Sequence, residues 1–263
     1  MMADNAHIHA RVLLEVCVDT AGGLAAAVQN GADRIELCSA LSEGGLTPSF
    51  GLMKLAAACD VPVRAMIRPR AGDFTYSDDE LAIMAADIDA AASCGLDGVV
   101  LCVNRPSGEL DEAALKALCE HARSLSLAIA LNRGLDLAPD PLTAMETAVA
   151  LGVDTLLTSG GAQTASQGAA GLAALVKAAR GRIEILAGGG VNSGNVAQLA
   201  AAGVTAFHAS CSAPLPVTNT RAAALGYVTA SQRDTDPASI AQLRQTLNRL
   251  SIESAPEKHH VVR

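Results

Sequence analysis

Leu14-Glu15-Val16-Cys17 and Ile35-Glu36-Leu37-Cys38 are two copies of one short motif, and each copy ends an apolar run. About twenty residues separate them, which is roughly the spacing of one β-strand followed by one helix. Side chains alternate along a strand, so the glutamate and the cysteine of each copy share a face. Two neighbouring parallel strands would therefore turn two carboxylates and two thiols toward the same space. A charge inside an apolar strand is costly unless it is paired or used, so the motif calls for a structural or chemical reason.

The alternation of strand and helix continues along the chain, from residue 12 to about residue 210. Strands are expected at residues 12–18, 34–38, 63–68, 98–103, 128–132, 155–158, 183–187 and 206–209. Helices are expected near residues 22–30, 49–59, 78–94, 111–123, 140–151, 169–180 and 193–202, with an eighth at 237–250. Eight strands, each followed by a helix, favour an α/β fold of the closed (β/α)8 TIM-barrel type, as a single domain over residues 11–251.

A doubly wound open sheet is the alternative fold. It is disfavoured because the GxGxxG turn that usually follows its first strand is missing. Residues 1–10 and 252–263 are expected to be flexible ends. Four histidines lie in these ends and are expected to be solvated: His7, His9, His259 and His260.

The composition fits one barrel and limits the class of partner. The chain has 263 residues, close to the roughly 250 of a typical TIM barrel. Half of its residues are apolar but none is Trp, so the core must be built from Ala, Leu, Val and Ile. A formal net charge of -8 argues against a nucleic-acid or anionic-membrane surface. A small molecule, an ion or another protein is the expected partner.

Seven cysteines in a chain of this length are too sparse for a disulfide scaffold. No charged start with an apolar stretch and a cleavage site precedes them, and a reducing cytoplasm is the simplest location. No apolar run approaches the roughly 18 residues needed to span a bilayer, so no membrane association is expected.

The active site of a barrel lies at the C-terminal ends of its strands, where this sequence places several cations. Arg68, Arg70 and Arg133 would bring three positive charges to one rim, which suits a carboxylate or a phosphate. A glycine run before the seventh helix resembles a phosphate cradle: Gly188, Gly189 and Gly190. In the alternative interpretation the arginines neutralise buried carboxylates and the glycines only form a turn. Further ligand-binding or catalytic candidates at strand ends are Asn132, Asp136, Ser159 and Ser210.

The paired motif offers two kinds of chemistry. Glu15 and Glu36 could act as general acid and base with separated pKa values. Cys17 and Cys38 could form a two-coordinate thiolate site, for which Cu(I) is the favoured metal. Against the metal, a buried cysteine more often behaves as a small apolar residue. His208 is the only histidine within an expected strand, and both a catalytic and a structural role remain open for it.

Together these residues resemble the CutC family, which is named for copper homeostasis. The resemblance runs through nearly the whole expected barrel, at residues 14–17, 30–38, 43–49, 67–70, 72–74, 76–78, 157–160, 188–191 and 208. It implies a TIM barrel, a cytoplasmic location, a homodimer or higher homo-oligomer, and an association with copper. It also implies that the polar strand ends could be catalytic.

One position departs from the family. The family pattern reads Phe-His-Arg-Ala-Phe-Asp at the end of the fifth strand, where residues 131–136 of this chain read Leu-Asn-Arg-Gly-Leu-Asp. Asn132 replaces the histidine and cannot take up a proton near neutral pH. If that histidine is an acid, a base or a metal ligand in the family, this chain uses other chemistry.

Three hypotheses follow. The first is a copper-associated barrel with Cys17 and Cys38 as Cu(I) ligands and without an evident organic cofactor. The second is an enzyme that acts on a small phosphorylated or carboxylated metabolite, with the two glutamates as acid and base and the arginines as an anion clamp. The third is a barrel without catalytic activity that serves as a scaffold, because TIM barrels host unrelated functions.

Overall fold

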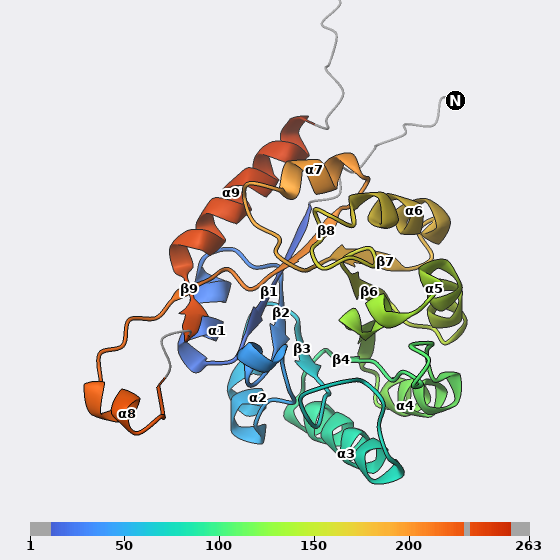
Figure 1. The fold of residues 1–263 in the computed structure, drawn as a ribbon, viewed down its shortest axis with the longest axis horizontal. Helices are drawn as coiled ribbons and strands as arrows, with labels where there is room; N and C mark the ends of the chain where they lie inside the picture. The colour runs from blue at the N-terminus through green and yellow to red at the C-terminus, as the bar shows by residue number, and fades with distance from the viewer. Residues whose placement is uncertain (1–11, 229–231, 254–263) are drawn as a thin grey trace, which may run out of the picture.

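A computed structural model describes residues 12–228 and 232–253. In this part of the chain, strands β1 to β8 pair in parallel and in sequence order, and β8 pairs with β1 to close a barrel (Figure 1). The strands are β1 (Leu13–Val18), β2 (Arg34–Leu37), β3 (Val63–Met66), β4 (Gly98–Leu101), β5 (Ala128–Leu131), β6 (Thr155–Thr158), β7 (Glu184–Ala187) and β8 (Ala206–Ala209). The expected TIM barrel is thereby confirmed.

A ring of helices surrounds the barrel (Figure 1). These helices are α1 (Ala21–Gln29), α2 (Phe50–Ala56), α3 (Asp78–Cys94), α4 (Glu112–Ser124), α5 (Pro141–Ala150), α6 (Ala169–Ala179), α7 (Val196–Ala201) and α9 (Pro237–Glu253). Two short 3-10 helices follow strand ends: η1 (Leu41–Glu43) and η2 (Arg133–Leu137). Among the described residues, every helix is too short or too polar to span a bilayer.

The strands are mostly shorter than the sequence predicts. β3, β4 and β5 end before Arg68, Val103 and Asn132, so these residues belong to the loops that carry the rim. α7 begins at Val196 and not near 193, because Asn192 closes a turn by accepting a hydrogen bond from the amide of Gly194. Both backbone and side-chain bonds place the residues in these loops: the amide of Asn132 donates to the carbonyl of Leu101, and the amide of Arg68 donates to the hydroxyl of Thr47.

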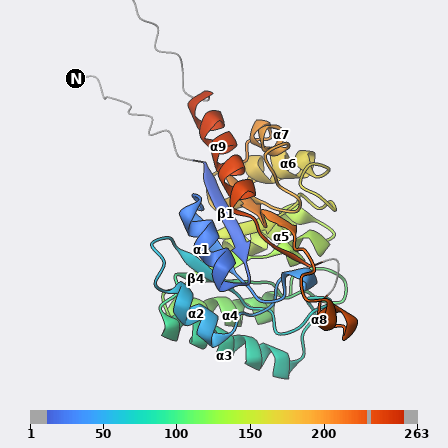
Figure 2. The same ribbon diagram turned by 90° about the vertical axis from the view of Figure 1, so that its left-hand side faces the viewer.

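The connection between β8 and α9 has structure of its own. It contains β9 (Ser212–Pro214), α8 (Thr220–Ala224) and β10 (Arg233–Thr235), and β9 pairs with β10 in an antiparallel sheet. α8 stands away from the ring of helices in both views (Figures 1 and 2). β10 lies against α1, where Gly23 leaves room for Thr235: a Cβ at Gly23 would meet the Thr235 hydroxyl at 2.6 Å.

Apolar side chains fill the layer between strands and helices, whereas charged side chains enter the interior of the barrel. The parallel register places Glu15 beside Arg34 on β2 and beside His208 on β8. Arg64 on β3 and Glu184 on β7 complete this inner set. The barrel interior is therefore polar at its centre.

Candidate functional site

The site is built on Glu15, which lies on β1 between two partners. Its Oε1 lies 2.8 Å from Nδ1 of His208, and its Oε2 accepts a hydrogen bond from Nε of Arg34 at 2.5 Å. Only 1% of Glu15 is exposed. A buried carboxylate with a partner on each oxygen is held in one orientation.

Opposing effects set the protonation of this pair. Burial disfavours the charge on Glu15, but the hydrogen bond with His208 and the charge of Arg34 outweigh it and lower the pKa of Glu15 to about 2. Burial likewise disfavours the charge on His208, but Cys17, Glu36 and Glu15 outweigh it and raise the pKa of His208 well above its usual value. Glu15 is thus ionised near neutral pH, and its contact favours the protonated form of His208.

Glu36 is the second carboxylate at the barrel floor. Its Oε2 lies 3.7 Å from Nε2 of His208 and accepts a weak hydrogen bond from the thiol of Cys38 at 3.6 Å. Its Oε1 is buried and has no hydrogen-bond partner in the described part of the chain. Burial raises the pKa of Glu36, and the nearby charge of Glu15 adds to this effect while His208 opposes it. Glu36 therefore holds its proton to higher pH than Glu15, and one of its oxygens lacks a partner.

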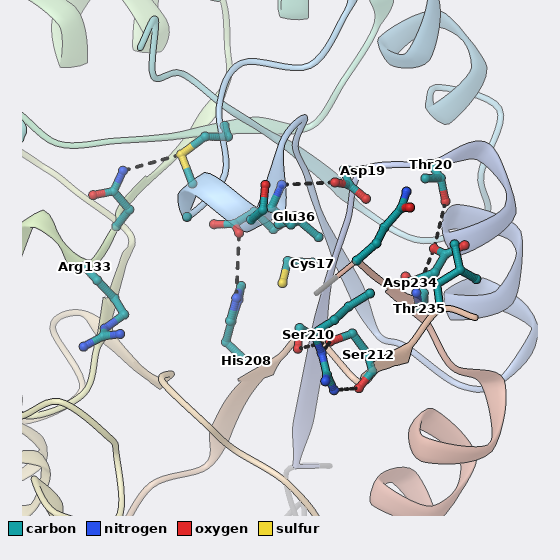
Figure 3. A pocket seen from close by; sticks show the side chains of 18 of the residues that line it. Cys17, Asp19, Thr20, Glu36, Arg133, His208, Ser210, Ser212, Asp234 and Thr235 are labelled. Atoms are coloured by element: carbon teal, nitrogen blue, oxygen red, sulfur yellow. Dashed lines mark hydrogen bonds and ion pairs between the residues drawn. The ribbon is translucent and has the colours of Figure 1, made fainter. Parts of the chain in front are cut away.

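Cys17 completes the floor. Its Sγ, a ring nitrogen of His208 and a carboxylate oxygen of Glu36 all lie within 4.8 Å of one another. Figure 3 shows the three side chains gathered at the centre of the cavity, with a dashed line between Glu36 and His208. Cys17 is 6% exposed, and all three residues line the cavity.

Cys38 is placed differently from Cys17. It is fully buried and packs with Met66, Val100 and Ala130, and it does not line the cavity. Burial and the neighbouring Glu36 raise the pKa of the Cys38 thiol well above its usual value. The two cysteines expected to act as a pair therefore differ: one belongs to the group with Glu36 and His208, and the other stands behind Glu36 as a buried thiol.

A cavity of about 710 Å³ opens above this floor. Its lining includes the apolar side chains of Leu41, Met66, Phe74 and Leu157 together with polar groups. The connection between β8 and α9 forms its outer wall through Ser212, Leu215, Tyr227, Gln232, Arg233, Asp234 and Thr235. Ser210 also lines it, and its hydroxyl lies 3.2 Å from that of Ser212. The volume is within the usual range of small-molecule pockets.

The three arginines expected to form one clamp have separate roles. Arg68 is buried and donates to the backbone carbonyls of Glu43, Gly45 and Gly72. Arg70 forms ion pairs at 2.5 Å with Glu80 and 3.0 Å with Asp73, and neither it nor Arg68 lines the cavity. Both hold loops in place.

Arg133 does line the cavity, with 39% of its side chain exposed. Its Nε pairs with Asp136 at 2.9 Å, and its Nη2 donates to the hydroxyl of Ser159 at 2.9 Å. Asp136 also accepts hydrogen bonds from the backbone amide of Ser159 and the hydroxyl of Thr158. Asp136 and Ser159 therefore position Arg133, which is the rim arginine best placed to meet an anion.

Asn132 and the glycine run also differ from their expected roles. Asn132 lines the cavity, but its amide nitrogen points to the sulfur of Met66 at 3.4 Å and its oxygen caps η2 by accepting from Gly134. The glycines after β7 do not line the cavity. Gly189, with φ at +99°, instead leaves room for Arg133, because a Cβ there would lie 3.2 Å from its guanidinium.

Sequence reasoning missed two groups of residues. Arg34 and Glu184 sit at the beginnings of their strands, where side chains usually stabilise the barrel, yet Arg34 contacts Glu15 directly. The signal was present, since Arg34 precedes the second motif by one residue. The outer wall after residue 212 carries no recognisable motif, so only the structure reveals it.

This arrangement suits two kinds of chemistry. A thiol, an imidazole and a carboxylate that orients the imidazole are the parts of a nucleophilic or acid–base site. The same groups also suit a metal site. Cys17 and His208 would be the ligands with Glu36 beside them, and Glu15 would support the other ring nitrogen of His208. The unpartnered Oε1 of Glu36 fits either, because a ligand would supply its partner.

The CutC family model matches residues 12–213 of the chain. The family protein CutC of Agrobacterium fabrum is 48% identical over 239 residues, which cover 90% of this chain and 94% of that protein. The family protein CutC of Sinorhizobium medicae is 47% identical over 245 residues, which cover 93% of this chain and 99% of that protein.

Solved structures agree on the barrel. A crystal structure of CutC from Streptococcus agalactiae, named there for copper homeostasis, is 32% identical with a TM-score of 0.72 and covers 76% of this chain and 98% of its own. A thiamine phosphate pyrophosphorylase from Pyrococcus furiosus has a TM-score of 0.57 at 16% identity, and the match covers 92% of this chain and 98% of that one. This second likeness concerns the fold alone.

Proposed function

The chain belongs to the CutC family, and from this premise and the geometry of the barrel floor we propose that it binds one Cu(I) ion between Cys17 and His208. Glu36 stands beside the ion, and Glu15 holds the other nitrogen of the imidazole ring. The proposed ligand pair replaces the pair Cys17 and Cys38 that the sequence alone favoured. The name of the Streptococcus agalactiae relative, which refers to copper homeostasis, supports the choice of metal.

One observation carries the proposal: the three donor atoms of Cys17, Glu36 and His208 lie within 4.8 Å of one another at the floor of an open cavity. Thiolate and imidazole are ligands that suit copper, and thiolates select Cu(I) among biological metals. A second carboxylate on Nδ1 of His208 is the usual support for a metal-bound imidazole. Cys38 is less suited, because it is fully buried and does not line the cavity.

An anaerobic Cu(I) competition titration against a chelator of known affinity tests the proposal. The parent is expected to bind one ion, and Cys17→Ser and His208→Gln are each expected to lose the site. Cys38→Ser is the matched control, because it removes a thiol of the same motif that does not line the cavity, and it is expected to keep the affinity. An equal loss of Cu(I) affinity in Cys17→Ser and Cys38→Ser would favour the Cys17–Cys38 site instead. Tight Cu(I) binding in all variants would refute both ligand pairs.

The size of the cavity favours a second candidate function. A single ion would leave most of the 710 Å³ empty, whereas a small organic molecule would fill it. In this function Glu36 and His208 are the acid–base candidates, Glu15 orients His208, and Cys17 is a nucleophile or a binding group. Arg133 takes an anionic group of the substrate, a carboxylate or a phosphate. No reaction is assigned.

A thermal-shift panel of small anionic metabolites tests this candidate. Compounds that bind are expected to raise the melting temperature of the parent but not that of Arg133→Met. Arg70→Met is the control, because Arg70 lies outside the cavity. A panel without any Arg133-dependent shift would count against the enzyme.

We also propose a cytoplasmic location and a homodimer or higher homo-oligomer. The seven cysteines of the chain are all free thiols in the structure, which suits a reducing compartment. The oligomer rests on the family resemblance, and light scattering on the purified chain measures it. A monomeric mass at micromolar concentration would contradict it.

A further inference from the structure

Charged side chains continue below the cavity floor, into the half of the barrel that the proposed copper site does not use. Arg34, Arg64 and Glu184 lie at the beginnings of their strands, at the end of the barrel opposite the cavity. Arg64 donates to the hydroxyl of Thr155 at 2.8 Å, and that hydroxyl donates to Glu184 at 3.1 Å. These groups form one connected network with Glu15.

Arg34 is the link between the two ends of this network. Its Nε donates to Glu15 at 2.5 Å, and its Nη2 donates to Glu184 at 2.7 Å. The side chain of Arg34 is 7% exposed, so water does not compete effectively for these bonds. The planar guanidinium fixes the angle between its two bonds, which binds Glu15 in one orientation.

The orientation of Glu15 determines that of His208. Oε2 of Glu15 is taken by Arg34, and Oε1 lies 2.8 Å from Nδ1 of His208. Rotation of the carboxylate would break at least one of these bonds inside the barrel and leave a buried polar group unpaired. With Nδ1 held, the other ring nitrogen of His208 faces Glu36 and the cavity.

We propose that Arg34 is a positioning residue: through Glu15 it fixes the imidazole ring of His208 with Nε2 toward the cavity, and Glu184 at the opposite end of the barrel fixes Arg34. This positioning role rests on the proposed copper site for its function, but every contact that carries it joins side chains of the chain itself.

The first test is spectroscopic. A proton on Nδ1 of His208 that is bonded to a buried carboxylate is expected to give a downfield, slowly exchanging signal in the proton NMR spectrum of the parent, absent from His208→Gln. Arg34→Met is expected to lose this signal. Arg34→Lys keeps the charge but cannot reproduce the two-bond geometry, so faster exchange is expected. Glu184→Gln is expected to shift the proton signal of His208, although Glu184 pairs with Arg34 and not with His208 itself.

Arg244→Met is the matched control. Arg244 is buried and pairs with Asp33 at 2.6 Å, so its loss removes a comparable ion pair of which neither Glu15 nor Arg34 is a member. It is expected to leave the signal of His208 unchanged. If Arg34→Met does not fold, Arg34→Lys decides. An unchanged signal in either folded Arg34 variant, or no such signal in the parent, would overturn the proposal.

The second test is the Cu(I) competition titration on the same variants. Loss of the support behind a metal-bound histidine typically weakens affinity 10- to 100-fold, and a loss of about tenfold is expected for Arg34→Met but not for Arg244→Met. If the parent binds no Cu(I), the proposed function fails, while the proton signal still decides the role of Arg34. If the parent binds Cu(I) and Arg34→Met binds it equally well with an unchanged signal, the positioning role fails alone.

Discussion

Glu15 keeps a full charge at the centre of a barrel because its partners arrive from the strands on either side, Arg34 from β2 and His208 from β8. The closure of β8 onto β1 brings residues 193 positions apart in sequence to 2.8 Å. No local pattern reveals that contact, whereas the pairing of Glu15 with Arg34 follows from the spacing of one strand–helix unit. The sequence thus singles out Glu15, Glu36 and His208, but it predicts neither the entry of Arg34 and Glu184 into the barrel nor the contact across its closure.

The pH dependence of stability is expected to report the state of His208. Its folded pKa is raised above the unfolded value of about 6.5, so its contribution to stability is fully present below about pH 6.5. That contribution is lost as the pH rises through the folded pKa. The melting temperature of the parent is therefore expected to fall more steeply from pH 6.5 into the alkaline range than that of His208→Gln.

Thermal unfolding between about pH 5 and pH 10 measures this difference. His121→Gln is the control, because His121 lies on α4 and its ring nitrogen pairs with the exposed Asp89. The control is expected to follow the parent. Parallel curves for the parent and His208→Gln would mean that the folded state does not favour the protonated ring.

At the scale of elements, the loops after the strands determine which polar groups reach the cavity. The sequence predicts the strands and helices to within a few residues, because apolar periodicity and caps are local. It places Arg68 and Arg70 on the rim with Arg133, yet the guanidinium of Arg68 binds carbonyls of the loops after β2 and β3, and that of Arg70 binds its own loop. Loop conformation depends on many weak contacts between distant segments, and these leave no simple sequence pattern.

The loop between β6 and α6 depends on close backbone contact at Gly160. A Cβ at this position would lie 2.2 Å from the carbonyl oxygen of Gly168, and φ is +74°. Gly181 also has φ at +74° but has nothing within 4 Å of a built Cβ. Gly181→Ala is expected to cost about 1 kcal/mol from backbone strain alone. Gly160→Ala is expected to cost at least about 2 kcal/mol more, because the backbone must move.

Denaturant unfolding of the two glycine variants isolates the steric contribution, since both residues have the same φ. Similar losses of stability in the two variants would show that the loop relaxes around the added methyl group.

The beginning of α3 carries a complete capping box. Ser77 accepts a hydrogen bond from the amide of Glu80, and the Glu80 side chain accepts one from the amide of Ser77. Ser77→Ala is expected to destabilise the chain by about 1 kcal/mol, because one amide of the first turn loses its partner. Ser93→Ala, an exposed serine in the same helix, is the control and is expected to change stability by less than about 0.5 kcal/mol. Equal effects of the two substitutions would contradict the capping role.

At the scale of the whole molecule, the chain is expected to behave as a single domain whose last helix is essential. α9 begins at Pro237 and packs against the barrel through Ile240, Leu243 and Leu247, which are all buried. It also supplies Arg244, whose Nη1 lies 2.6 Å from Asp33 and whose Nη2 donates to the carbonyl of Val12. α9 thus contacts the segment just before β1, next to the strand pair that closes the barrel.

A chain that stops at residue 236 is therefore expected to lose cooperative unfolding. Loss of three buried aliphatic side chains costs roughly 2–5 kcal/mol each, which is comparable in sum to the 5–15 kcal/mol stability of a typical domain. A chain that stops at residue 253 keeps all of α9 and is expected to retain one cooperative transition within about 2 °C of the parent.

Calorimetry distinguishes the two truncated chains. A cooperative transition in the chain that stops at 236 would show that the barrel closes without its eighth helix, and two transitions in the parent would contradict the single domain. The site residues at the barrel floor are expected to lose their arrangement in the same transition, because the pairing of β1 with β2 and β8 holds Glu15, Arg34 and His208 together.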